Sequence, residues 1–545
     1  MKKTKILLAL LALLIGFNAQ AQMNPKMKLQ DALKLIQDNY VDPVNDEHVV
    51  DAAIKAMLSD LDPHSSYVSR EEVEAMSEAM KGSFAGIGIQ FSMVADSTFI
   101  TGINADGPAA RVGLQVGDQI ITVDGKSIFG KDLKNQEVMR LLRGEKGKSV
   151  KLNIVRKSQS TALAFNVVRE QIAELSVTTS YMVTQNIGYI ALSIFSQSTR
   201  REIDAALKSL KAQGMTKLIL DLQSNGGGLV EAAIGVADEF LPREKMVFYS
   251  VTNTGVKDHF LTGGYGQFNT GDLVVLIDES TASSSEILTG CLQDWDRAVV
   301  VGRRSFGKGL MQKGLELSDG SIIRLTAARY YTPSGRSIQK PYTKGKTDYF
   351  EDFNRRMASG ELTKGGHVNF PDSLKYSTLT NKRTVYGGGG IMPDKFVPID
   401  TAIYSVWLNR LMNSGLVTKS AFNYVQQNRQ SLMSAFDTFE SFDKGYRVDE
   451  KMLDKVFENA AALKIKLPLK SDQVTRKTIS VEIKAEIAEM LYTGKGYALR
   501  VRNESNHEFS TALSILTSPA DYNKLLAGKQ QVKSSSSNKT AKKNL

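Results

Sequence analysis

Residues 272–288 read DLVVLIDESTASSSEIL, and this stretch combines a strand, a tight turn and the start of a helix. Its apolar beginning has the length of a buried strand, and small hydroxyl residues favour the turn that follows. From Ile287 onward, apolar residues recur at helical spacing. At a helix N-terminus, free backbone N–H groups and the helix dipole favour a developing negative charge. A serine in this turn is therefore a candidate nucleophile.

A structural interpretation of the same serines is available. Serine is a preferred N-cap residue, and Ser283 together with Glu286 fits the capping-box pattern. The turn alone leaves capping and nucleophilic catalysis open, so the rest of the chain has to decide between them.

The composition is that of a globular protein. The chain has 545 residues, 42% hydrophobic and 23% charged, enough for three or four domains of roughly 100–200 residues each. The single cysteine, Cys291, excludes an internal disulfide framework and a cysteine-based zinc site. The five histidines are scattered without metal-ligand spacing, so we predict no metal and no cofactor. A histidine-dependent catalytic triad stays open.

Residues 1–21 have the features of a secretory signal peptide. Early lysines precede an apolar run, and the segment ends in Ala19-Gln20-Ala21, a small-x-small cleavage pattern. An uncleaved membrane anchor is less favoured because the run is shorter than the ~20 residues that a span needs. We expect an exported protein of the bacterial periplasm, soluble after cleavage, and leave proximity to the membrane surface open.

The last residues, 529–545, form a basic tail. Lysines surround Ser534–Ser537, and such a segment is expected to be disordered and solvated. The net charge of the chain is +11, but its basic residues are not interleaved with aromatic ones. We therefore predict no nucleic-acid partner.

Residues 83–170 are rich in glycine and in short alternating strands. At 107–125 the chain reads GPAARVGLQVGDQIITVDG, and together with residues 86–89 this segment resembles a PDZ domain. Successive N–H groups of a glycine-rich loop can hold an anion, and an exposed strand edge can accept a peptide. A generic small β domain is the alternative. The resemblance implies that a peptide carboxylate binds at four residues, Gly86, Ile87, Gly88 and Ile89.

Residues 171–342 alternate strands and helices, and a glycine-rich turn separates one such pair. The strand 216–222 ends in QSNGGG at 223–228, and a helix follows at once. The turn could cradle a phosphate, although neither the dinucleotide-binding nor the P-loop pattern is present. It could instead offer N–H groups to an oxyanion, or it could be a plain tight turn.

Lys308 lies in the sequence Phe306-Gly307-Lys308-Gly309, close to further apolar residues. A lysine held among apolar groups has a lowered pKa, which would suit it to act as a base near neutral pH. The alternative is an ordinary exposed lysine of a loop.

Ser283, Lys308, Gln312 and the turn at 225–228 together resemble the carboxy-terminal processing, or tail-specific, serine peptidases. Lys308 follows Ser283 by 25 positions and Gln312 follows Lys308 by four, as in that family. The alignment selects Ser283 over the two serines after it. The turn at 61–65 and the GGGGIMPD segment at 387–394 also match, so the resemblance covers about residues 28–400.

The resemblance implies a chemistry. Ser283 would be the nucleophile, Lys308 the general base and Gln312 the residue that orients the lysine. The N–H of Ser284 and that of Gly227 or Gly228 would bind the oxyanion. The family's arginine and proline in this turn are replaced here by Gln223 and Gly226, so the register of the second donor stays open.

The resemblance also implies a multidomain α/β fold and a class of substrate. The catalytic core would have the α/β superhelical fold of crotonase and Clp-peptidase type. Proteins or peptides with free C-termini would be the partners, recognised through the PDZ domain. A homo-oligomer and an adaptor protein are left open.

The chain thus divides into six expected segments. We expect the insert at about 343–383 to be a surface excursion, and we read 478–487 and 497–501 as candidate strands. The segments are a signal peptide at 1–21, an N-terminal helical domain at 22–82, a PDZ domain at 83–170, a peptidase core at 171–400, a mainly helical C-terminal region at 401–528 and the tail at 529–545.

Two other functions compete with peptidase activity. A non-catalytic binding protein could use the PDZ domain as a scaffold, but it would not need both Ser283 and Lys308. A crotonase-like acyl-CoA enzyme would need a cytosolic cofactor, which conflicts with the expected signal peptide.

Overall fold

The structure is a computed structural model that describes residues 24–528, except 95–96, 131–133, 158, 160, 365–369, 402–404 and 493–495. The expected signal peptide and basic tail lie outside the described residues. The chain forms two compact units. The first comprises residues 1–69 with 314–325, and the second comprises 70–313 with 326–545.

The first unit is mainly helical, as expected for the N-terminal helical domain. It contains α2 (Pro25–Asn39), α3 (Asp46–Leu61) and the short strand β1 (Ser66–Val68), which pairs antiparallel with the first residues of β18 (Ile322–Tyr331). Helix α3 begins after Asn45, whose side chain accepts the N–H of His48 and so satisfies a free donor of the first turn.

The predicted PDZ domain lies in the second unit. Helix α4 (Arg70–Lys81) precedes it. Its main sheet has the order β3-β4-β5-β7-β8, with β6 on β5, and β2 pairs with β9. Its core is aliphatic and includes Ile100, Val138 and Leu152, all fully buried. Its elements are β2 (Ser83–Gly86), β3 (Ile89–Val94), β4 (Ser97–Ile103), α5 (Pro108–Arg111), β5 (Gln119–Val123), β6 (Lys126–Ser127), α6 (Asn135–Leu142), β7 (Ser149–Val155), β8 (Leu163–Val168) and β9 (Glu170–Ala173).

A six-stranded sheet forms the centre of the second unit. Its order is β10-β11-β12-β15-β16-β21; β10 is antiparallel to β11 and the other neighbours are parallel. The inner strands are apolar on both faces, as expected for parallel strands covered on both sides. The strands are β10 (Val177–Met182), β11 (Ile187–Leu192), β12 (Lys217–Asp221), β15 (Asp272–Ile277), β16 (Val299–Gly302) and β21 (Lys395–Phe396).

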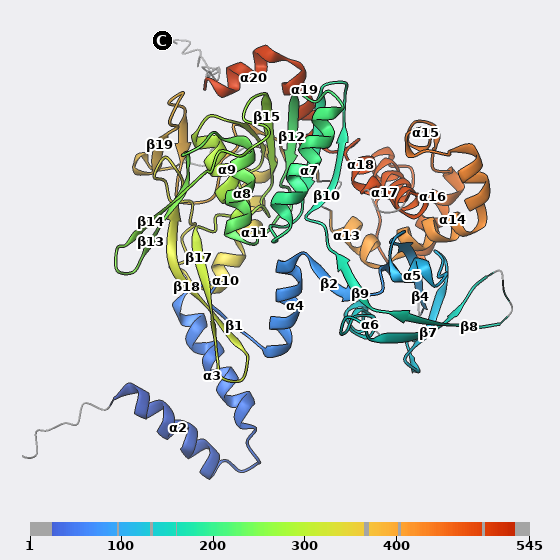
Figure 1. Cartoon of the computed structure of the whole chain (residues 1–545), viewed down its shortest axis with the longest axis horizontal. Helices are drawn as coiled ribbons and strands as arrows, with labels where there is room; N and C mark the ends of the chain where they lie inside the picture. Colours follow the sequence, from blue (N-terminus) through green and yellow to red (C-terminus); the bar gives the residue numbers. More distant parts are fainter. Residues whose placement is uncertain are drawn as a thin grey trace, which may run out of the picture. The chain divides into compact units, whose positions relative to one another are not determined.

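Different parts of the chain cover the two faces of this sheet (Figure 1). On one face, α7 (Thr199–Ala212), α8 (Val230–Phe240) and α9 (Ser284–Asp294) pack against the sheet. On the other face lie α19 (His507–Thr517) and α20 (Pro519–Leu526).

The contacts of α19 and α20 tie distant parts of the sequence to the sheet. Phe509 packs on Tyr189 with a ring separation of 5.5 Å. The buried Arg303, just after β16, forms ion pairs with Glu279 at 2.6 Å and with Glu508 of α19. The second face of the sheet is therefore completed by residues about two hundred positions downstream of its last long strand.

A β-ribbon accompanies the central sheet in the second unit. Strand β13 (Met246–Thr252) pairs with β14 (Lys257–Leu261) and with the later residues of β18. Strand β17 (Leu310–Glu316) pairs with β18. Strands β19 (Lys375–Ser377) and β20 (Thr384–Tyr386) form a separate hairpin.

The expectation of a surface excursion at 343–383 is wrong for its first half. That part forms the helices α10 (Lys346–Phe350), α11 (Asp352–Ala358) and α12 (Glu361–Lys364). Tyr349 and Leu362 are 1% and 0% exposed, so the segment packs into the protein. Its polar composition misled because the buried polar groups are paired in ion pairs.

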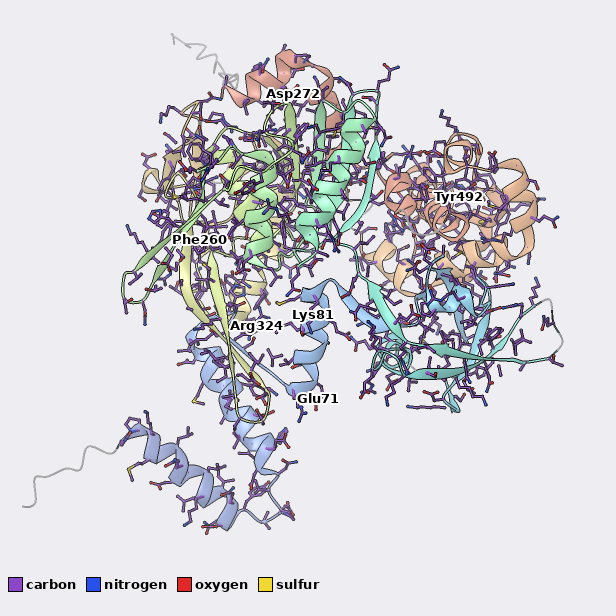
Figure 2. The ribbon with its side chains drawn as sticks, viewed as in Figure 1. Glu71, Lys81, Phe260, Asp272, Arg324 and Tyr492 are labelled. Carbon is purple, nitrogen blue, oxygen red and sulfur yellow. The ribbon has the colours of Figure 1, made fainter. Side chains whose placement is uncertain are left out.

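The C-terminal helices are more regular than the sequence suggested. Residues 478–487 and 497–501, read as candidate strands, are helical in α17 and α18. The β-branched residues mimic a strand pattern, but Ile479, Ile483 and Ile487 lie four apart on one buried face. Tyr492, which is labelled in Figure 2, is the C-cap residue of α17, and its N–H donates to the carbonyl of Ala488. The helices are α13 (Val406–Asn413), α14 (Leu416–Ala435), α15 (Phe439–Gly445), α16 (Glu450–Ala462), α17 (Gln473–Leu491) and α18 (Tyr497–Arg502).

Candidate active site

Ser283 ends the turn between β15 and α9, in the strand–turn–helix arrangement that the sequence predicted. Its backbone has φ 57° and ψ −117°, a conformation that residues other than glycine rarely adopt. Ser283 and Glu286 have the capping-box arrangement: the N–H of Ser283 donates to the Glu286 carboxylate at 2.9 Å, and the N–H of Glu286 donates to the Ser283 carbonyl at 2.8 Å. Capping and a catalytic role are therefore compatible at this turn.

Lys308 lies in the loop between β16 and β17, and its side chain is half-buried. Its ammonium nitrogen donates to Oε1 of Gln312 at 3.0 Å. The structure therefore brings Lys308 and Gln312 together, as the family resemblance implied.

Glu286 joins the turn of Ser283 to the loop of Lys308. Its fully buried carboxylate accepts the N–H groups of Ser283 and Lys308, both at 2.9 Å, and that of Gly307 at 2.7 Å. The hydroxyl of Ser305 donates to it as well, at 2.5 Å. Burial raises the pKa of Glu286, and these hydrogen bonds oppose the rise. The sequence placed Glu286 only in the first turn of the helix; its capping-box position hinted at the bond to Ser283, not at the bonds to the loop.

Tyr330 of β18 makes a second connection. Its buried hydroxyl lies 2.7 Å from the carbonyl oxygen of Lys308 and 3.3 Å from that of Ser283. Burial raises the pKa of Tyr330, so the group stays protonated and can donate. No local sequence signal identified this residue.

The glycine-rich turn lies directly against the turn of Ser283. The carbonyl of Asn225 accepts the N–H of Ala282 at 3.0 Å, and the carbonyl of Gly228 accepts the hydroxyl of Ser284 at 2.8 Å. At Gly227, where φ is +102°, an added Cβ would come within 2.8 Å of the Cβ of Ser283. Only glycine fits there, and a plain tight turn does not explain so close an approach.

The N–H groups of this region differ in their partners. The N–H of Gly227 donates to Oδ1 of Asn225 at 2.9 Å. Gly228 forms a parallel bridge to Phe195 through the atoms of its neighbours, so its own N–H and carbonyl point away from Phe195. Within the part of the chain that the structure describes, neither the N–H of Gly228 nor that of Ser284 has an acceptor.

Two buried carboxylates accept hydrogen bonds from backbone N–H groups of these turns. Asp278 accepts the N–H of Ser224 and that of Thr281, both at 2.9 Å. Asp221 accepts the N–H of Gln223 at 2.8 Å and the hydroxyl of Tyr189 at 2.6 Å. Burial raises the pKa of Asp278 and raises that of Asp221 to about 7.

The four residues predicted to bind a peptide carboxylate line one groove of about 330 Å³. Phe91, Met139 and Leu142 give this groove an apolar wall. Arg143 also lines it; its guanidinium lies 4.0 Å from the ring centre of Phe84 and pairs with Glu78 at 3.1 Å. The sequence analysis did not select Arg143.

Among the described residues, no group of three or more His, Cys, Asp or Glu side chains could hold a metal ion. The single cysteine is buried in the core. No helix in the described ranges is long and apolar enough to span a membrane.

Comparison with protein families assigns the parts of the chain. A model of peptidase family S41 matches residues 186–347, and a PDZ model matches 99–156. The N-terminal domain of the activating protease CtpB matches 16–72, and a family of unknown function matches 407–494.

Comparison with individual proteins agrees. The carboxy-terminal-processing protease of Bartonella bacilliformis is 36% identical over 332 residues, which are 59% of this chain and 74% of the relative. The carboxy-terminal processing protease CtpB of Bacillus subtilis is 33% identical over 57% of this chain and 65% of its own. A solved photosystem II D1 C-terminal processing protease is 29% identical and covers 57% of this chain and 89% of its own, with a TM-score of 0.34. With its PDZ domain and its S41 core, the chain belongs to the carboxy-terminal processing proteases.

Proposed function

We propose that this protease is an exported serine endopeptidase that cleaves protein substrates through a Ser283–Lys308 dyad. The observation that carries the proposal is that Glu286 and Tyr330 each contact the backbones of both residues. The amine of Lys308 donates to its predicted partner Gln312.

The first half of the reaction forms an acyl-enzyme. Neutral Lys308 accepts the hydroxyl proton of Ser283 while the serine oxygen attacks the scissile carbonyl carbon. The tetrahedral intermediate collapses, the C–N bond breaks, and Lys308 returns the proton to the leaving amine. Gln312 orients the amine of Lys308 through its side-chain carbonyl.

In the second half, water replaces the amine. The water oxygen attacks the acyl carbon while Lys308 accepts a proton from the water. Lys308 then returns that proton to the oxygen of Ser283 when the ester bond breaks. The peptide then leaves with a free carboxylate, and the enzyme returns to its starting state.

For the oxyanion we favour the N–H groups of Ser284 and Gly228. Both lack an acceptor among the described residues, whereas the N–H of Gly227 is occupied by Asn225. The packing of Gly228 against Ser284 supports this pair. Loss of one such donor typically costs about 100–1000-fold in rate.

The PDZ groove supports recognition of substrates by their C-termini. Its apolar wall suits a hydrophobic last residue, and the loop from Gly86 to Ile89 would bind the carboxylate. Export rests on the signal-peptide pattern of residues 1–21, and the enzyme would then act on exported proteins in the periplasm. A homo-oligomer or an adaptor would be compatible with this function.

Replacement of Ser283 by alanine tests the dyad. The substrate is an unstructured polypeptide with an apolar C-terminus, and cleavage is followed by mass spectrometry. We expect Ser283→Ala to lose cleavage by at least about 1000-fold. Ser280→Ala is the matched control, because Ser280 is an exposed serine of the same turn whose backbone N–H, not its hydroxyl, bonds to Asp278. Equal cleavage by wild type and Ser283→Ala would refute the dyad.

A further inference from the structure

The loop that carries Lys308 is held from two sides, and the mechanism above uses only one of them. We call residues 304–308 the base loop. Its N–H groups at Gly307 and Lys308 donate to Glu286. Its other side contacts residues 346–364, the helices α10 to α12, which we call the clasp.

Arg356 of the clasp binds the carbonyl side of the base loop. Its side chain is 4% exposed, and its guanidinium donates to the carbonyl oxygens of Arg304 at 2.6 Å and Ser305 at 3.5 Å. Buried carbonyls need such partners, because an unpaired buried polar group costs about 1–3 kcal/mol. Arg356 therefore fixes the two residues with which the base loop begins.

Glu361 fixes Arg356 and the base loop together. It accepts two hydrogen bonds from Arg304, at 2.8 and 2.9 Å, and one from Nε of Arg356 at 2.8 Å. Burial opposes ionisation of Glu361, but the hydrogen bonds and charges of the two arginines outweigh it and lower its pKa. The carboxylate thus stays charged and holds both guanidinium groups.

An aromatic contact fixes the next part of the base loop. The ring of Phe306 packs edge-on against Tyr349 of α10 at 5.7 Å. The ammonium of the buried Lys340 lies 3.7 Å from the ring centre of Phe306 and 4.3 Å from that of Tyr349, and 3.5 Å from Asp352 of α11. The N–H of Lys340 also donates to the carbonyl of Gly307 at 3.0 Å.

We propose that the clasp positions the catalytic base, and that Arg356 is its central positioning residue. Every residue of the base loop before Lys308 has a contact with the clasp or with Lys340, so the backbone position of Lys308 depends on these contacts. This inference rests on the proposed function, because it assigns Lys308 the role of base.

Arg356→Met tests this proposal, with Arg355→Met as its matched control. Arg355 is the neighbouring arginine of α11, and its partners among the described residues, Asp348 and Asp352, both lie within the clasp. For Arg356→Met we expect kcat to fall about 10–100-fold with KM within about twofold, because a base displaced by ~1 Å loses its geometry. We expect Arg355→Met to resemble the wild type.

The pH dependence of kcat separates positioning from stability. If the base loop loosens, the surroundings of the proposed base change, and the acidic limb of the kcat profile, which reports ionisation of that base, should shift. A variant that is only less stable has a smaller folded fraction, measured by thermal melting, but an unchanged profile. The proposal is overturned if Arg356→Met and Arg355→Met share the same kcat per folded molecule and the same acidic limb.

Two further variants keep the test decisive. If Arg356→Met does not fold, Glu361→Gln removes the charge that orients Arg356 and should give a smaller shift in the same direction; an unshifted profile again overturns the proposal. Ser283→Ala distinguishes the two levels. If it is inactive while Arg356→Met matches the wild type, only the clasp fails. If Ser283→Ala stays active, the dyad fails and the clasp proposal with it.

Discussion

At the scale of single residues, one carboxylate links nucleophile and base. Glu286 gathers three N–H groups and a hydroxyl around two oxygen atoms, and both residues of the proposed dyad are among the donors. The backbones of Ser283 and Lys308 are therefore both hydrogen-bonded to the same carboxylate, so a shift of either backbone strains its bond to Glu286.

Glu286→Gln should separate these two backbones. The amide nitrogen of glutamine is a donor and would face backbone N–H groups, so at least one bond is lost. We expect kcat to fall about 100-fold while KM changes little, because the site loses alignment rather than binding surface. The measurement is steady-state kinetics on a peptide substrate. Glu231→Gln, at an exposed glutamate in the first turn of α8, is the control. A kcat of Glu286→Gln within about twofold of the wild type would contradict the expectation.

Asp221→Asn should change how stability depends on pH. The pKa of Asp221 is raised from 3.8 to about 7 by burial, so between these values the unfolded chain ionises while the folded chain keeps its proton. The contribution of Asp221 to the free energy of unfolding is greatest below pH 3.8. It decreases by roughly 2–4 kcal/mol as the pH rises from there through about 7. Asparagine has no ionisable group, so this loss is absent in the variant. Its free energy of unfolding relative to that of the wild type should therefore rise between pH 3.8 and about 7.

Urea unfolding at several pH values measures this gain. The exposed Asp258→Asn is the control, and it should follow the wild type at every pH. If the difference between Asp221→Asn and wild type stays constant from pH 4 to 8, the raised pKa is not the cause of any stability change.

At the scale of elements, the candidate site lies where two turns contact each other. The turn at 223–228 and the turn at 278–283 follow neighbouring parallel strands, so their carboxyl ends place them side by side. The two turns exchange hydrogen bonds through Asn225, Ser284 and Asp278. The nucleophile is thus shaped by a segment more than fifty residues away in the sequence.

Gly227→Ala should damage this contact, and Gly226→Ala should not. A methyl group at Gly227 would lie 2.8 Å from the Cβ of Ser283, at a positive φ of 102°, whereas one at Gly226 meets nothing within 4 Å. We expect Gly227→Ala to lose at least about 100-fold in kcat and about 1–3 kcal/mol of stability. Steady-state kinetics and thermal melting test both; equal activity of the two variants would rule out this packing.

The local part of the site was predictable from the sequence, and the part made by distant strands was not. The strand–turn–helix unit of Ser283 and the four-residue spacing from Lys308 to Gln312 depend on neighbours in the chain. Tyr330 reaches the site only because β18 returns beside it, and no residue near it in the sequence signals that. The helix α17 was misread for a related reason: β-branched residues suit strands, and only the buried four-residue spacing reveals the helix.

At the scale of the whole molecule, the central sheet depends on helices distant in the sequence. Phe509 of α19 packs on Tyr189 in the buried layer on the second face. Phe509→Ala should lower the free energy of unfolding by about 3–5 kcal/mol, as truncation of a buried aromatic ring does. Leu469→Ala, at a side chain 78% exposed, should change it by less than about 0.5 kcal/mol. Denaturant unfolding measures the free energy of unfolding of both variants. Similar losses for Phe509→Ala and Leu469→Ala would show that α19 does not stabilise the sheet.

The ion pair between Arg303 and Glu508 has a consequence for how the protease comes into being. Arg303 lies five residues before Lys308, and its partner is 205 positions further along the chain. During synthesis, the segment that contains both residues of the proposed dyad emerges long before α19 can cover the sheet. Until then the sheet lacks one of its faces, and Arg303 lacks one of its counter-charges. We therefore expect the central sheet, which carries the turn of Ser283, to be complete only once the residues of α19 and α20 have been synthesised.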